Sequence, residues 1–148
     1  MKRLTLAAAI GLFAAAPLSA QGPSGTWFTE FERQIRNQDG QVSGGDKTKA
    51  KITLEQKGDS LFGTLEIVPA AGQPAPPARQ LRGVVKGDRG TLFTEFEARR
   101  SVNGEESIAK IQVTYDFTIS ADKLEGTSKA RSADSDMPPR PFSAWRGK

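Results

Sequence analysis

Apolar and polar residues alternate with a period of two along most of the chain, which is typical of strands that bury one face. The pattern is clearest over residues 109–119, where every second residue from Ala109 to Ile119 is apolar and the residues between are polar. The same alternation predicts further strands at about 26–34, 48–57, 61–68, 80–86, 91–99, 124–131 and 141–146. No stretch carries the period of an amphipathic helix, so the pattern predicts an all-β fold.

The predicted links between these strands alternate in length. Those at 58–60, 87–90 and 120–123 are tight turns, those at 35–47, 69–79 and 132–140 are long, and the one at 100–106 is intermediate. Alternate links of an up-and-down meander lie at the same end of the sheet. The chain is therefore expected to form an eight-stranded antiparallel up-and-down barrel, with a floor of tight turns and a mouth of longer loops.

One motif occurs twice, at Gly25–Glu32 and at Gly90–Glu97, and the copies differ only where Trp27 is replaced by Leu92. Duplication of a four-strand half explains this identity. The alternative is that the strands of one barrel resemble each other because they meet the same constraints.

The motifs at the two ends of the predicted barrel resemble those of the calycin superfamily, which includes the lipocalins, the fatty-acid-binding proteins and the avidins. Gly25-Thr26-Trp27 resembles the opening Gly-x-Trp motif, Arg146 resembles the closing arginine, and Gly63-Thr64 is similar to the third strand of avidin-type barrels. The resemblance implies the same eight-stranded barrel. It does not carry biotin binding, because avidins line that site with several tryptophans and this chain has only Trp27 and Trp145.

Trp27 and Arg146 are expected to meet at the floor, since the first strand starts there and the last strand ends there. A guanidinium over an indole face contributes about 0.5–2 kcal/mol, and its planar donors can hold the carbonyls of the floor turns. We therefore interpret this pair as structural, with Trp27 as a ligand anchor being the alternative.

Residues 1–20 have the layout of a secretory signal peptide. Lys2 and Arg3 precede an apolar run from Leu4 to Ala16, and Ala20 is a small residue at the expected cleavage site. The run is too short to span a membrane, and an uncleaved N-terminal anchor is the alternative. We thus expect a single domain over residues 21–148, exported to a bacterial periplasm or to the medium.

The amino-acid composition limits the kinds of catalytic and metal-binding sites that the chain can form. The chain has no histidine and no cysteine, which removes the commonest general base, the thiol nucleophile and the commonest transition-metal ligands. It also excludes disulfides. Without Lys2 and Arg3 the balance is 21 − 2 = 19 basic against 17 acidic residues, and no basic stretch with interleaved aromatics predicts nucleic-acid binding.

The repeated glutamates are the remaining candidates for catalysis. The alternation places Glu30, Glu32, Glu95 and Glu97 on the face opposite Trp27, where they are expected to point to solvent. Glycoside cleavage by a carboxylate pair and weak calcium binding are therefore minor alternatives. We expect no catalytic residue, no metal site and no cofactor.

The mouth is the candidate functional end. The alternation places a group of residues on the inner face near it: Phe31, Arg33, Phe96, Ile111 and Phe142. Loop residues, among them Arg79 and Arg140, are expected to form a mildly basic rim. An apolar pocket with such a rim would favour an apolar or amphiphilic ligand with a negative head.

Two alternatives to a ligand pocket stay open. An eight-stranded barrel is just wide enough to hold one small ligand or to be filled by its own side chains. The long loops, above all the proline-rich residues 69–77, could instead serve a protein-interaction or inhibitor module.

Overall fold

The computed structural model describes residues 22–36 and 42–147. The predicted signal peptide, residues 1–20, lies outside the described residues, as do the side chains of residues 33–36, 42–44, 100 and 102. The strands are β1 (Gly25–Arg36), β2 (Val42–Lys57), β3 (Ser60–Ile67), β4 (Arg79–Lys86), β5 (Arg89–Val102), β6 (Glu105–Ile119), β7 (Lys123–Ser132), β8 (Ser135–Asp136) and β9 (Arg140–Arg146).

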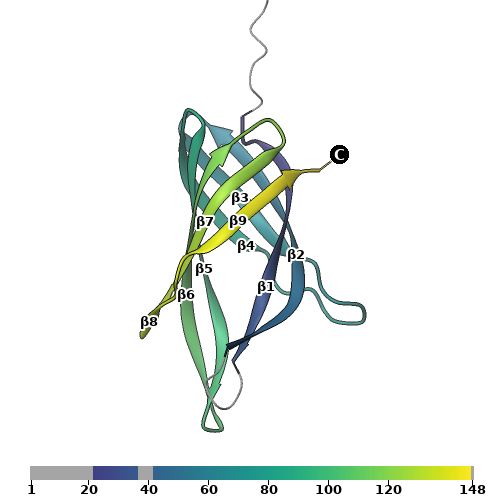
Figure 1. Ribbon diagram of the computed structural model, residues 1–148, viewed down its shortest axis with the longest axis vertical. Helices are drawn as coiled ribbons and strands as arrows, with labels where there is room; N and C mark the ends of the chain where they lie inside the picture. The colour runs from purple at the N-terminus through teal and green to yellow at the C-terminus, as the bar shows by residue number, and fades with distance from the viewer. Residues whose placement is uncertain (1–21, 37–41, 148) are drawn as a thin grey trace, which may run out of the picture.

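These strands close into one antiparallel barrel, which confirms the predicted fold class (Figure 1). Each strand from β1 to β6 pairs with its neighbours in the chain, β7 joins β6 to β9, and β9 closes the barrel against β1. The short β8 pairs only with the end of β7 and extends beyond the barrel. Among the residues described, none belongs to a helix that is long and apolar enough to cross a membrane.

The floor half of the barrel is filled by its own side chains. Trp27, Ile52, Leu61, Leu92 and Leu124 are buried on the inner face, where they pack with the other apolar residues of a single core. Alternation on every strand brings these residues inward, because side chains of successive strand residues point to opposite faces. Of the two alternatives for the interior, the filled core therefore holds for this half.

Inward-facing glycines let neighbouring strands approach closely. A Cβ atom on Gly63, Gly83 or Gly126 would collide with the backbone of the adjacent strand. Glycine at such positions is typical of sharp bends in closed barrels, where another backbone comes close. None of these residues was singled out for this role by the alternation of polar and apolar positions.

Two hairpins continue beyond the barrel at the mouth, and we call them the arms (Figure 1). The first arm is residues 30–36 with 42–49, and the second is residues 94–102 with 105–110. β1 pairs with β9 only over Trp27–Thr29, and β4 pairs with β5 only as far as Phe93, so beyond these points the first strand of each arm pairs only with the second strand of the same arm. The two arms lie on opposite sides of the barrel, because two strands separate them in either direction around the sheet.

The arms correct two predicted links. Residues 100–106 were expected to form a loop, but β5 and β6 pair up to Val102 and Glu105. Asn103 and Gly104 form the turn with φ angles of 54° and 82°, which is the Asn-Gly combination that favours a two-residue hairpin. Likewise β1 and β2 pair through much of the predicted link at 35–47, and only residues 37–41 lie outside the described part.

The two copies of the repeated motif occupy equivalent places. Each begins the first strand of an arm, with Trp27 or Leu92 buried in the core. The outward side chains of Phe28 and Phe93 are 37% and 41% exposed, whereas the inward side chains of Thr29 and Thr94 are 4% and 1% exposed. The repeat therefore gives the same inside and outside pattern to both halves of the barrel.

The floor contact predicts a clear difference between the two tryptophans. Truncating a buried aromatic side chain leaves a cavity, so Trp27→Ala should lower the free energy of unfolding by about 3–5 kcal/mol. Trp145 is 44% exposed, and Trp145→Ala should cost about 1 kcal/mol or less. Urea unfolding followed by far-ultraviolet circular dichroism measures both. Equal losses would mean that Trp27 does not hold the floor.

Candidate functional site

The inner face changes from apolar to polar where the barrel meets its mouth. Moving from the floor, the next inward position after Leu81 on β4 is Arg79, and the next after Leu92 on β5 is Thr94. The same step takes β6 from Phe117 to Tyr115, β7 from Gly126 to Ser128, and β9 from Phe142 to Arg140. We call these five residues the polar arc: Arg79, Thr94, Tyr115, Ser128 and Arg140.

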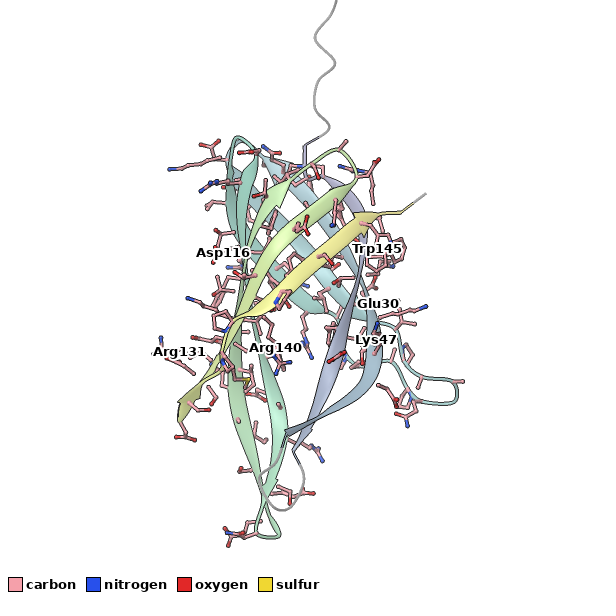
Figure 2. The ribbon with its side chains drawn as sticks, viewed as in Figure 1. Glu30, Lys47, Asp116, Arg131, Arg140 and Trp145 are labelled. Carbon is pink, nitrogen blue, oxygen red and sulfur yellow. The ribbon has the colours of Figure 1, made fainter. Side chains whose placement is uncertain are left out.

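The pairing register makes this arc continuous. Arg140 is the Cα partner of Ser128, and Ser128 is the partner of Tyr115. Tyr115 is in turn the partner of Leu92, which precedes Thr94 on the inner face of β5. Figure 2 shows Arg140 where β9 begins, at the level where the arms leave the barrel.

Arg79 is the charged centre of the arc. Its guanidinium carbon lies 3.5 Å from the centroid of the Phe96 ring. Burial lowers the pKa of Arg79, and the neighbouring Tyr115 opposes that shift. Within the described part of the chain no carboxylate forms an ion pair with Arg79. A half-buried cation is thus stacked on an aromatic ring without a counter-charge.

Tyr115 stands beside this cation. Its ring centroid lies 4.9 Å from that of Phe142 at an interplanar angle of 54°. Burial raises the pKa of the Tyr115 phenol, and the charge of Arg79 partly offsets the increase. The phenol has no hydrogen-bond partner among the described residues, so its hydroxyl is available to a ligand.

The equivalent threonines of the repeat differ in their hydrogen bonds. The Thr29 hydroxyl donates to the Ser143 carbonyl at 2.7 Å and so bridges β1 and β9. The Thr94 hydroxyl is buried, and it is the one buried side-chain polar atom in the described residues that has no partner. Buried polar groups are hydrogen-bonded in the great majority of cases, so Thr94 marks a place where a partner is missing.

The opposite wall of the mouth is apolar. Its inward positions on β1, β2 and β3 are Phe31, Ala50 and Ile67. Phe31 is 39% exposed although it follows Trp27 and Thr29 on the inner face of β1. Solvent therefore reaches the inner surface at this level, in contrast to the filled floor.

The structure places the predicted site residues at different depths. Ile111 and Phe142 are buried, and Phe142 packs against Tyr115 and Phe117. Phe96 is half-buried under Arg79, and Phe31 lies on the apolar wall. Arg33 belongs to β1, but its side chain lies outside the described residues.

The predicted floor pair lies at the opposite end of the barrel. The Arg146 guanidinium carbon is 4.2 Å from the Trp27 ring centroid. Arg146 donates to the carbonyls of Gly22 at 3.0 Å, Ser24 at 2.8 Å and Ala121 at 3.2 Å. The Trp27 indole donates to the Pro23 carbonyl at 2.7 Å. These contacts use the donors of both side chains within the protein.

The loop lengths predict Arg79 and Arg140 in a loop rim. The alternation does not single out Thr94, Tyr115 or Ser128 as site residues. The signal for Arg79 was present, because it precedes Leu81 by two residues and therefore shares its face. The same parity relates Arg140 to Phe142. The first residue of a strand already follows the alternation of inward and outward side chains, even when it directly follows a loop.

Two surface hollows lie away from the polar arc. One is at the floor beside Gly22, Ser24, Gln56, Gly58 and Arg146, and another is near the tip of the second arm beside Arg99, Glu106, Ser107 and Ile108. Neither is lined by the polar arc. No group of acidic side chains in the described residues is placed to hold a metal ion.

The chain was also compared with known proteins. A scan against protein-family models and a search of curated proteins find no match. The closed eight-stranded barrel is consistent with the fold of the calycins. The candidate site therefore rests on the geometry of the mouth.

The two threonines give the first test of the site. Thr94→Val removes a buried hydroxyl that has no partner, so it should raise the free energy of unfolding by about 1 kcal/mol. Thr29→Val removes the bond to Ser143 and should lower it by a similar amount, about 1 kcal/mol. Urea unfolding of the two variants measures the sign of each change in the free energy of unfolding. A loss in both variants would show that Thr94 has a partner in solution.

Tyr115 gives a second test, because it is the sole tyrosine of the chain. Its phenol should ionise above the ordinary pKa of 10.0, as followed by the absorbance of the phenolate. A folded-state pKa raised above the unfolded value adds stability that is complete below the unfolded pKa and is lost as the pH rises through the folded one. Arg79→Gln should raise the pKa of Tyr115 further, since the guanidinium charge lowers it. Ionisation at or below pH 10.0 would contradict the described burial.

Proposed function

We propose that this protein binds a small amphiphilic ligand with an anionic group at the mouth of its barrel, without catalysis. The observation that carries the proposal is Arg79, which is half-buried on the inner face and has no carboxylate partner among the described residues. Buried charges in proteins are ordinarily paired. A ligand anion would supply the missing partner.

The contact with Phe96 leaves Arg79 free to bind. A guanidinium stacked on a ring uses its face, whereas its five N–H donors lie in its plane. Carboxylates, sulfonates and phosphates match that planar set of donors. The apolar side chains of Phe31 and Ile67 would cover the rest of the ligand.

The filled floor limits how deep a ligand can lie. Trp27, Leu61 and Leu124 are completely buried in the core, so a ligand would stay above them, between the two arms. This supports a role for Phe31 and for Phe96, whose register partner is Ile111. Phe142 supports the site from below.

Catalysis at the mouth is less well supported than ligand binding. The repeated glutamates are exposed on the outer face, where Glu30 lies 3.9 Å from Lys49 and Glu95 lies 2.9 Å from Lys110. The polar arc instead offers cations and hydroxyls, which hold an anion without acting on it.

We further propose that the protein is an exported bacterial member of the calycin group. The Gly-x-Trp start, the closing Arg146 and the barrel support this membership. The charged start and apolar run of residues 1–20 support export.

Binding of anilinonaphthalene sulfonate, an aromatic anion that fluoresces in apolar surroundings, tests the proposed function. Arg79→Gln should weaken binding about tenfold or more, because a hydrogen bond to a charged group is lost. Phe96→Ala should weaken it as well. The matched control is Phe93→Ala, which removes an outward phenylalanine of the same strand and should leave the affinity unchanged.

The opposite result would overturn the proposal. If Phe93→Ala weakens binding and Phe96→Ala does not, the probe lies on the outer surface. Native mass spectrometry of protein taken from its own compartment adds an independent measurement, in which a bound small anion is the expected finding.

A row of outward residues favours partner-protein binding as a second candidate function. Arg82 on β4 is the register partner of Phe62 on β3 and of Phe93 on β5, and both phenylalanines are exposed. The proline-rich link at 68–78 is exposed throughout. This row lies on the strands, whereas the sequence pointed to the loops. The Phe93→Ala variant should no longer bind such a partner protein, whereas the Phe96→Ala variant should still bind it.

A further inference from the structure

Two arginines face each other across the mouth. Arg79 lies on β4 and Arg140 on β9, and three strands separate β4 from β9 in either direction around the barrel. Both residues are half-buried at the mouth end of their strands, with the parity of the inward residues Leu81 and Phe142. The two arginines therefore lie on opposite walls of the barrel, each near its mouth end.

Neither of these arginines has an acceptor within the described residues, unlike two others. Arg131 points away from the barrel in Figure 2 and lies 3.6 Å from Asp136. Arg146 donates to carbonyls at the floor. For Arg79 and Arg140 no hydrogen bond or ion pair is found in the described part. Asp46 lies at the register irregularity of the first arm, is exposed, and forms no ion pair with either arginine.

The arc between the two cations combines hydroxyl groups with aromatic rings. Thr94, Tyr115 and Ser128 lie between Arg79 and Arg140 in strand order, and none of their hydroxyls has a partner in the described residues. The rings of Phe96, Tyr115 and Phe142 follow the same course. Flat rings beside the site favour a flat ligand, because offset and edge-to-face aromatic contacts add to the gain from burial.

Resting on the function proposed above, we propose that the ligand class is a linear aromatic dianion, with one anionic group on Arg79 and the other on Arg140. Each guanidinium binds one anionic group through its planar donors. The ring system between them lies along Phe96 and Tyr115, with Phe142 supporting Tyr115 from below. The free hydroxyls donate to the anionic oxygens. An amphiphile with a single anionic head would leave Arg140 without a partner.

Isothermal titration calorimetry with matched synthetic acids tests this ligand class. The probes are terephthalate and biphenyl dicarboxylate, which differ in length, and the monomethyl ester of each. At least one diacid should bind about tenfold or more tightly than its ester. Arg79→Gln and Arg140→Gln should each reduce that preference to about twofold or less, since either variant leaves one cation.

Outward arginines provide the controls. Arg82→Gln changes the same strand as Arg79 on its outer face, and Arg131→Gln changes an exposed arginine near Arg140. Both should keep the preference for the diacid, because neither side chain reaches the mouth. The ionisation of Tyr115 gives an independent signal, since a dianion bound beside the phenol should raise its pKa further.

The outcomes separate this proposal from the proposed function. If the esters bind as tightly as the diacids, or if Arg140→Gln keeps the preference, the dianion class is wrong while binding of anilinonaphthalene sulfonate can still establish the mouth as a site. If neither diacid binds at millimolar concentration, the dianion class is also overturned. Only insensitivity of the sulfonate probe to Arg79 and Phe96 would overturn the mouth site itself.

Discussion

The closure of β9 against β1 is the constraint on which the barrel depends. The register joins these strands over Trp27–Thr29 alone, so side chains supply what a longer ladder would otherwise give. Arg146 stacks on Trp27 and donates to carbonyls that precede β1 and follow β6. A guanidinium can do this because its fork of donors reaches several acceptors in one plane. The closure therefore gathers both ends of the folded chain at the floor.

A barrel closed firmly at one end is free to open at the other. Beyond Thr29 and Phe93 the first strand of each arm pairs only within its own hairpin. The inner faces of the arms are therefore less covered than the floor, although Arg79 still lies over the Phe96 ring. This explains why the inward side chains pass from completely buried Leu61 and Leu92 to the half-exposed Phe31. It also explains where polar residues can face inward, since half-solvated positions reduce the cost of desolvation. The polar arc lies at this transition.

The sequence predicts the barrel well because period-two alternation depends only on which face is buried. All eight strands of the closed barrel coincide with predicted strands, and the repeat in β1 and β5 has the expected inside and outside faces. Only the outer ends of the arms were missed, because their residues lack the apolar alternation that burial requires, and Asn103-Gly104 was interpreted as part of a loop. The polar arc was missed for a related reason. Arg79 and Arg140 follow proline-containing links, and charge at a strand end was assigned to the rim without considering parity.

The comparison of the two repeats shows that the site arises from differences between similar halves. Thr29 and Thr94 have the same sequence context and the same burial, yet only Thr29 finds an acceptor on the neighbouring strand. Two residues further along β5, the Arg79 guanidinium lies over the Phe96 ring. A fold selected only for stability would pair or remove such groups, because unpaired buried polar atoms and desolvated cations both reduce stability. Departures from local rules are expected at functional sites, where stability is given up for binding. In this barrel the departures gather on one arc of the mouth, while the opposite wall of β1, β2 and β3 follows the ordinary rules.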